Sequence, residues 1–195
     1  SSQLFLYKDA ALSTSVGANM TALLSDAAVA HIEWTRSKEP DLLSRISSLP
    51  SGTTSTGNRF VGGATYTTAS KLSVTAEYEY NGFALSRSSW AALGSAPATQ
   101  LAYLSEAVQL QELPSRQAYL VYVTQKDLWL RNLDLTAYLR FNPDDNSRLA
   151  WVELRHHWSK FDLTLQLQQN MGNATSDFGI LPDRRLVQVL GTYYF

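Results

Sequence analysis

Polar and apolar residues alternate, position by position, in many separate segments of this 195-residue chain. Residues 161–171 (FDLTLQLQQNM) are typical, because Phe161 and Leu163 point to one side of an extended chain and Asp162 and Thr164 to the other. A period of two belongs to a β-strand with one apolar and one polar face. The pattern predicts strands at residues 3–8, 15–24, 28–36, 60–68, 72–82, 117–126, 133–142, 148–158, 161–171 and 186–195.

The connections between these segments fall into two groups. Short turns are expected at residues 25–27, 69–71, 127–132 and 159–160, and they alternate with connections at 9–14, 37–58, 84–115, 143–147 and 172–185. Alternate connections of an antiparallel up-and-down sheet lie at the same end of the sheet. The sequence therefore predicts a single all-β sheet with short turns at one end and the long loops at the other.

The turn at residues 159–160 also predicts a register. Two turn residues pair Trp158 with Phe161 and His157 with Asp162, so that apolar positions meet apolar ones and polar positions meet polar ones. The segment 117–126 is apolar on both faces, and its sides stay unassigned.

The composition excludes several classes of function. The 16 Lys and Arg residues are balanced by 17 Asp and Glu residues, which leaves no basic surplus for nucleic acid. The chain has no cysteine, and so neither disulfides nor thiol chemistry. No apolar run reaches the roughly 18 residues of a membrane-spanning helix, although alternating strands cross a bilayer without one. Because the chain opens at Ser1 without a signal segment, we expect it to be processed or part of a longer polypeptide.

The last ten residues, LVQVLGTYYF, alternate up to a terminal aromatic residue. Through Val187, Val189, Tyr193 and Phe195 this segment resembles the C-terminal signature strand of Gram-negative outer-membrane β-barrels, although Gly191 stands where that family has a larger apolar residue. The resemblance implies that the barrel assembly machinery reads these four residues during insertion.

The same resemblance implies the architecture and location of the protein. We expect an antiparallel transmembrane up-and-down β-barrel of about ten strands in the bacterial outer membrane, either a single domain or the C-terminal part of a larger barrel. The short turns would be periplasmic and the long loops extracellular. The expected surroundings are outer-membrane lipid, including lipopolysaccharide.

Aromatic residues collect at the ends of the predicted strands. Their rings prefer the two interfaces of a membrane, so we expect an aromatic girdle near each rim. The alternative is a soluble sandwich or a lipocalin-like barrel with its apolar faces turned inward, which gives no reason for aromatics at two rims. The girdle positions are Trp34, Phe60, Tyr80, Phe141, Trp158 and Phe161.

If the apolar faces meet lipid, the polar faces line the interior. Two functions follow from their mixed charges. The first is a porin-like or export channel for small solutes, with the charges setting its selectivity. The second is a non-conducting structural barrel, whose interior charges pair and whose long outer loops bind a protein partner or an oligomer neighbour. The expected lumen-lining residues are Glu33, Glu77, Glu79, Arg140, Glu153 and Arg155.

Candidate catalytic and metal-binding patterns are few. The predicted cross-strand pair of His157 and Asp162 is interpreted as a structural link rather than an acid–base catalyst. His31 and Glu33 share a face but supply only two of the about three or four ligands that a metal site needs. No enzymatic activity, metal or cofactor is predicted, and a membrane hydrolase is the least favoured hypothesis.

Residues 99–113, in the longest loop, depart from the strand pattern. Leu101, Leu104 and Val108 recur at helical spacing behind Thr99, a candidate N-cap. We expect a short helix that folds inward as a constriction, folds outward as a contact with a partner or lipid, or packs on neighbouring loops.

Overall fold

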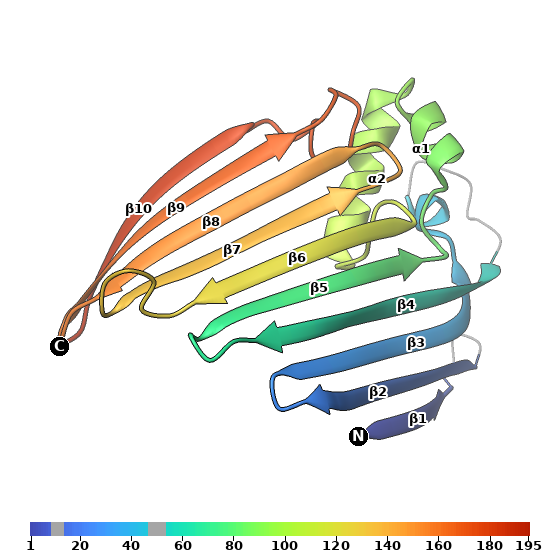
Figure 1. Ribbon diagram of the computed structural model, residues 1–195. Coiled ribbons are helices and arrows are strands. Elements are labelled where there is room, and N and C mark those ends of the chain that lie inside the picture. The colour runs from blue at the N-terminus through green and yellow to red at the C-terminus, as the bar shows by residue number, and fades with distance from the viewer. Residues whose placement is uncertain (9–13, 47–53) are drawn as a thin grey trace.

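The computed structural model of the protein describes residues 1–8, 14–46 and 54–195. They form one antiparallel sheet in which each strand pairs with the next strand along the chain (Figure 1). The predicted up-and-down sheet and its ten strands are therefore confirmed. The strands are β1 (Ser2–Tyr7), β2 (Ser15–Ser25), β3 (Ala28–Pro40), β4 (Thr54–Thr67), β5 (Leu72–Asn81), β6 (Gln117–Gln125), β7 (Leu133–Asn142), β8 (Ser147–His157), β9 (Phe161–Met171) and β10 (Arg185–Tyr193).

Two strands are longer than their sequence pattern predicts. β3 continues to Pro40 and β4 begins at Thr54, and the two remain paired as far as these residues. The apolar alternation stops earlier because the last residues of β3 are polar on both faces. The predicted loop at 37–58 is correspondingly shorter. Its residues 47–53, and residues 9–13 of the first predicted loop, lie outside the described residues.

The connections separate to the two ends of the sheet as predicted. Short turns join β2 to β3, β4 to β5, β6 to β7 and β8 to β9 at one end, which we call the turn end (Figure 1). The opposite end, called the loop end, carries the connections at 82–116, 143–146 and 172–184. All the helical segments of the described residues lie in loop-end connections. They are η1 (Leu42–Arg45), α1 (Arg87–Leu93) and α2 (Pro97–Gln109).

The helix expected at residues 99–113 is present as α2, but it begins earlier. Ala96 precedes its first turn and Pro97 occupies that turn, where the missing N–H of proline costs nothing. The prediction of Thr99 as the N-cap is therefore wrong. Helix α1 was not predicted; it begins after Ser86, whose hydroxyl oxygen accepts a hydrogen bond from the Ser89 backbone N–H. Among the described residues, no helix has the length and apolar character needed to cross a membrane.

The face of α2 that packs inward matches the predicted apolar stripe only in part, because Leu104 packs against the buried core whereas Leu101 is exposed. Gln100, Tyr103 and Ala107 are buried, whereas Val108 is 75% exposed. Gln100 is accommodated because its side-chain Nε2 donates to the carbonyl oxygen of Thr175 at 2.7 Å, which ties α2 to the 172–184 connection. Packing of Tyr103 and Ala107 among buried apolar side chains, together with the Gln100 hydrogen bond, sets the rotation of this helix.

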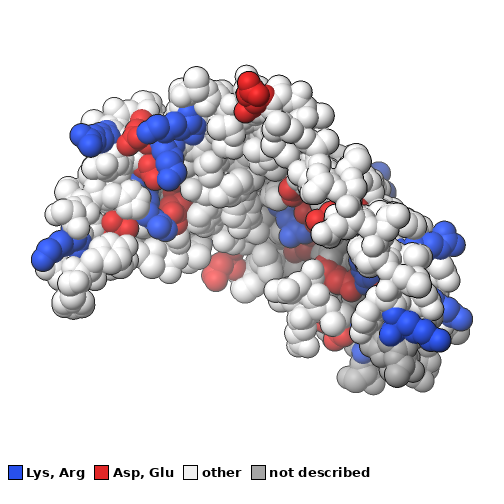
Figure 2. All heavy atoms as spheres, turned by 90° about the horizontal axis from the view of Figure 1, so that it is seen from below, with Lys and Arg blue, Asp and Glu red and all other residues white. Residues whose placement is uncertain are grey.

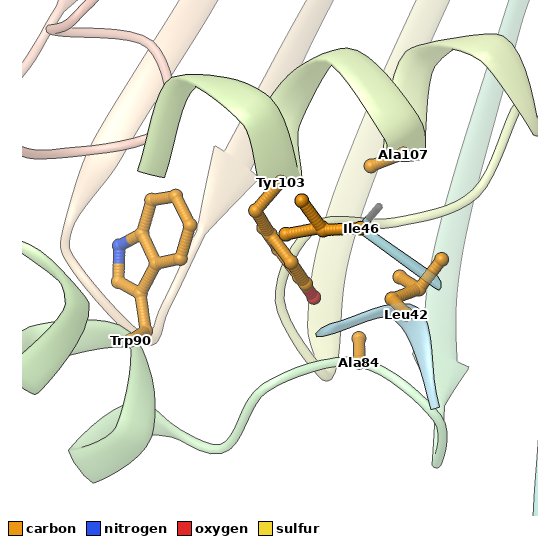
Figure 3. Close-up of a cluster of buried hydrophobic side chains, with 6 residues drawn as sticks. All are labelled: Leu42, Ile46, Ala84, Trp90, Tyr103 and Ala107. Atoms are coloured by element: carbon orange, nitrogen blue, oxygen red, sulfur yellow. The ribbon is translucent and has the colours of Figure 1, made fainter. Parts of the chain in front are cut away.

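The buried apolar core of the molecule lies at the loop end. Trp90 and Tyr103 pack with ring centroids 6.1 Å apart (Figure 3). The Trp90 Nε1 donates a hydrogen bond to Asp145 at 2.9 Å. The Tyr103 hydroxyl donates to the carbonyl oxygen of Pro114 at 2.7 Å, and burial raises the pKa of this phenol. The loop-end cluster consists of Leu42, Ile46, Ala84, Trp90, Tyr103 and Ala107.

The sheet itself packs against no second apolar layer. Apart from Ala118 of β6, every buried apolar side chain of the described residues lies in a loop or helix. Within those residues β1 and β10 each pair on one side only, and the sheet curves into an open arch (Figures 1 and 2). The loop-end cluster therefore covers one end of an arch whose broad surfaces stay accessible.

Candidate functional site

All six residues expected to line a lumen lie on one face of the sheet, because partners directly opposite in a ladder share a face. Glu79 pairs with Val61, which pairs with Glu33. Thr136 pairs with Glu153, next to Asp134 paired with Arg155. Figure 2 shows that the molecule is hollowed and that acidic and basic side chains gather along the hollow. The polar face is therefore the concave face of the arch.

The pairing of β6 assigns its residues to the two faces of the sheet, which the sequence alone did not do. Leu120 pairs with Glu77 on one side and with Arg140 on the other, so it lies on the concave face. Tyr119 pairs with Tyr78 and with Phe141 on the convex face. Strand β6 thus adds no charge of its own to the concave face, between the charged residues of β5 and β7.

Several of the concave-face charges are paired, either between strands or along one strand. The Arg140 Nη2 lies 3.2 Å from Glu79 Oε2, and the Arg155 Nη2 lies 3.0 Å from Glu153 Oε1. Glu153 also accepts a hydrogen bond of 2.6 Å from Gln166. The side chains of Arg140 and Arg155 remain 37% and 43% exposed, whereas those of their partners Glu79 and Glu153 are 21% and 11% exposed.

A further pair on the concave face, His31 with Glu77, reaches across an intervening strand at a glycine. His31 of β3 and Glu77 of β5 are both opposite Gly63 of β4, and His31 Nε2 lies 3.2 Å from Glu77 Oε1. A Cβ at Gly63 would stand 2.6 Å from both the Glu77 Cγ and the Ala76 carbonyl oxygen. Because Gly63 has no side chain, the side chains of His31 and Glu77 can meet above it.

The predicted pair of His157 and Asp162 is present at the turn end. The two residues are opposite each other in β8 and β9, and His157 Nδ1 lies 3.0 Å from Asp162 Oδ1. Asp134 approaches the other ring nitrogen at 3.6 Å, and the Tyr194 hydroxyl donates to Asp162 at 2.9 Å. Since Asp162 already accepts from two neighbours, the arrangement ties β7, β8, β9 and the C-terminal segment together.

The convex face is apolar and exposed. Leu167 and Val189, which are opposite each other in β9 and β10, are 45% and 66% exposed. Rings form a continuous row over β4 to β7, with centroid separations of 6.2 Å from Phe60 to Tyr78, 5.2 Å from Tyr78 to Tyr119 and 6.3 Å from Tyr119 to Phe141. Sequence reasoning missed Tyr78 and Tyr119, although their alternation placed Tyr78 on the apolar side.

The remaining girdle positions extend these rows at both ends of the sheet. Trp34 and Tyr80 flank Phe60 in adjacent strands toward the loop end. At the turn end, the Trp158 and Phe161 rings lie 5.7 Å apart. All six girdle positions belong to the convex side, in two separate bands.

The C-terminal strand presents its apolar residues on the same convex face. Val187, Val189 and Tyr193 lie opposite Leu167, Leu165 and Phe161, and the Phe195 ring packs 5.2 Å from that of Tyr193. A Cβ at Gly191 would lie 3.1 Å from the ring of Phe161, so the glycine makes room for that aromatic side chain. The departure from the signature pattern at this position has a local steric reason.

At the loop end, an ion network fastens the helical insertion to the sheet. Arg59 of β4 binds Glu39 of β3 at 2.8 Å and Glu112, just beyond α2, at 2.6 Å. Arg45 adds a second contact to Glu39 at 3.0 Å, and the Asn81 side chain donates to Glu112 at 2.8 Å. Sequence reasoning missed this network; the inward position of Arg59 follows from the outward Phe60, but its partners are remote in sequence.

The end of α2 is what brings Glu112 to Arg59. Gln111 has a left-handed backbone with φ of 56°, its N–H donates to the Val108 carbonyl, and the Glu112 N–H donates to the Ala107 carbonyl. This pair of bonds is a Schellman motif, which reverses the chain direction after a helix. Since Arg59 and Asn81 are concave-face residues, α2 is held over the concave side and not against the convex one.

The described residues hold no group of three or more His, Cys, Asp or Glu side chains that could bind a metal ion. His31 contacts Glu77 of β5, and Glu33 is exposed on the same face. Comparison of the chain with protein-family models, curated proteins and solved structures finds no match.

Proposed function

We propose that this chain forms the wall of an outer-membrane β-barrel, whose concave face lines a water-filled path for small solutes. The observation that carries the proposal is the exposed apolar convex face, which spans the sheet and on which no other described segment packs. Exposed apolar patches on soluble monomers seldom exceed a few hundred Å². A sandwich would bury this face against a second layer, whereas lipid covers it without one.

The proposal includes closure of the sheet. The edges at β1 and β10 carry unpaired backbone groups, and each such group left in hydrocarbon costs several kcal/mol, on the order of a lost hydrogen bond. β1 and β10 run antiparallel in a ten-strand meander, so they can pair with each other or with strands of a larger barrel. Either arrangement leaves the polar face inside.

The concave charges favour a hydrated path over a dry plug. The arginine side chains in the pairs of Arg140 with Glu79 and of Arg155 with Glu153 are partly exposed. The desolvation penalty of such pairs stays small where water remains in contact with them. Pairing of opposite signs also keeps the net field of the wall small. We therefore expect weak selectivity that depends on single charges.

Helix α2 defines the loop end of this path. Glu112, just beyond the helix, contacts Arg59 and Asn81 and so holds α2 over the concave face. This position agrees with the inward-folded alternative for residues 99–113. A helix in this place narrows the entrance while the middle of the wall stays open. Solutes would pass beside the loop-end cluster.

A second candidate is a non-conducting barrel that binds a protein partner through its long outer loops. It is favoured by the pairing of the interior charges and by the amount of ordered structure in the 82–116 connection. In that case α2 and its neighbours form a plug, and the outer surface of the loop end carries the function.

Single-channel conductance of the purified protein in a planar bilayer tests the proposal. Folding is checked first by heat-modifiable gel mobility. Stable open steps are expected, and Arg140→Gln should shift selectivity toward cations because it leaves Glu79 unpaired, whereas Glu79→Gln should shift it toward anions. Lys160→Gln, in an exposed turn outside the wall, is the matched control and should leave selectivity unchanged.

A silent bilayer from folded protein would reject the channel and support the plugged barrel. Open steps whose selectivity is the same in both wall variants would show that these charges do not line the path. Placement in the outer membrane is tested separately with Phe195→Ala, which should lower insertion by the assembly machinery and leave unfolded protein in the periplasm. Normal insertion of that variant would remove the role assigned to the C-terminal strand.

A further inference from the structure

A cavity of about 350 Å³ lies at the loop end between α2 and the 172–184 connection. Its lining is mainly apolar, including Val108, Phe178 and Leu181, and Arg140 of β7 contributes a polar part. This volume lies within the roughly 300–1,000 Å³ typical of small-molecule sites. The loop end therefore offers a partly enclosed apolar surface of ligand size.

Three charged side chains contribute to the lining, and two of them are matched. Glu112 binds Arg59 at 2.6 Å, and Arg140 lies 3.2 Å from Glu79. Asp177, in contrast, forms no ion pair within 4.0 Å among the described residues. The cavity thus carries an excess of one carboxylate.

The Asp177 carboxylate is fixed in place but poorly compensated. Its backbone N–H donates to Asp145 Oδ2 at 2.7 Å, and the next residue donates to Ser147 Oγ at 3.4 Å. The side chain accepts only a long bond of 3.4 Å from Asn142. Burial, with the Asp145 carboxylate nearby, raises the pKa of Asp177 to about 6, and the Arg140 guanidinium and the Asn142 hydrogen bond offset this only in part. A cation in contact with Asp177 would supply the missing partner.

We propose that this cavity binds small amphipathic cations, with an ammonium group against Asp177 and an apolar body against Val108, Phe178 and Leu181. A neutral ligand of the same shape leaves the carboxylate uncompensated, and an anion is repelled by it. The cavity lies at the loop end, and apart from Arg140 of β7 its lining belongs to α2 and to the connections. The inference does not depend on whether the lumen conducts, and its test uses no conductance.

Isothermal titration calorimetry on the folded protein in detergent micelles measures the preference. The probes are 2-phenylethylamine, its neutral analogue 2-phenylethanol and the anion 3-phenylpropionate, at a pH above the pKa of Asp177. The amine should bind at least about tenfold more tightly than the alcohol, which corresponds to the about 1.4 kcal/mol of one charge-assisted contact. The anion should bind most weakly.

Variants separate the cavity from partition into micelles. Asp177→Asn should lower amine affinity about tenfold and leave the alcohol unchanged, since only the charge is removed. Asp183→Asn, an exposed carboxylate of the same connection, should change neither. Equal binding of the amine to the native and Asp177→Asn proteins would overturn the proposal, as would preference for the anion.

A second variant tests the apolar half of the site. Val108 is largely exposed on α2, so Val108→Trp fills the cavity without disturbing the loop-end cluster. Affinity for the amine and the alcohol should both fall at least about tenfold. Unchanged amine binding in this variant would place the site elsewhere and refute the assignment.

Discussion

Replacing Asp177 with asparagine should stabilise the protein at neutral and alkaline pH. In the folded protein, burial and the nearby carboxylate of Asp145 make ionisation of Asp177 unfavourable, so its pKa stands at about 6 instead of 3.8. Asparagine has nearly the same shape and no charge. It keeps the place of the side chain beside Asn142 and removes the energetic penalty of the charge.

The size and sign of the effect follow from the pKa values. An acid with a raised folded pKa binds more protons folded than unfolded between pH 3.8 and about 6, so stability falls as the pH rises through this window. The penalty is absent below pH 3.8 and complete above about pH 6. At 1.36 kcal/mol per pH unit, it amounts to at most about 3 kcal/mol. Asp177→Asn should be more stable by that amount above the window and equal to the native protein below it.

Urea unfolding of both proteins in lipid vesicles, followed by tryptophan fluorescence at a series of pH values, measures the difference. Subtracting the two curves isolates Asp177 from other titrating groups. Asp183→Asn is the control and should show no pH-dependent difference, because that side chain is exposed. A native protein as stable as Asp177→Asn at alkaline pH, or a difference that grows as the pH falls, would refute the reasoning.

Further predictions concern the wall and the loop end. Gly63→Ala should cost about 1–3 kcal/mol in urea unfolding because its Cβ meets a backbone carbonyl, whereas Gly62→Ala, which meets only a side-chain ring, should cost less. Asp145→Asn should cost about 1–3 kcal/mol in the same assay, since this carboxylate accepts hydrogen bonds from the Trp90 indole and from two backbone N–H groups. Gln111→Gly should stabilise by about 0.5–1 kcal/mol in thermal unfolding, because glycine adopts the left-handed backbone without strain.

The stability effect and the proposed binding site are two consequences of one feature. A carboxylate that weakens the folded state is tolerated where it serves a function, which is the usual exchange between stability and activity. If amine binding at Asp177 is real, the amine should recover part of the lost stability. Unfolding of the native protein in the presence of 2-phenylethylamine would then shift to higher urea, and that of Asp177→Asn would not.

Parts of the site were predictable from residues that are close in the meander. The link between His157 and Asp162 follows from a two-residue turn, because register propagates from the turn into both strands. The pairing of His31 with Glu77 was not predictable, since it passes over a third strand and depends on a missing side chain at Gly63. Sequence spacing determines which residues pair in adjacent strands, but not which side chains meet across an intervening strand.

The loop end was the least predictable part. Leu101 and Val108 suggested one buried face for α2, and the structure buries another that includes Gln100 and Tyr103. Packing in one cluster with Leu42 and Ile46 and a hydrogen bond from Gln100 to the Thr175 carbonyl set that rotation, and no sequence period records partners so far along the chain. The charge excess at Asp177 likewise emerges only when α2, β7 and the 172–184 connection are brought together.

The sequence by itself determined the ten strands, their order and, except in β6, the two faces of the sheet, because a period of two and short turns are properties of neighbouring residues. Only the tertiary structure decided the inward position of α2, the ion network around Arg59 and the cavity beside Asp177. Those features join residues separated by tens of positions, such as Arg59 and Glu112, whose contact depends on the chain reversal at the end of α2. The local sequence pattern determines the sheet, and long-range packing determines how the helical insertion is placed at its loop end.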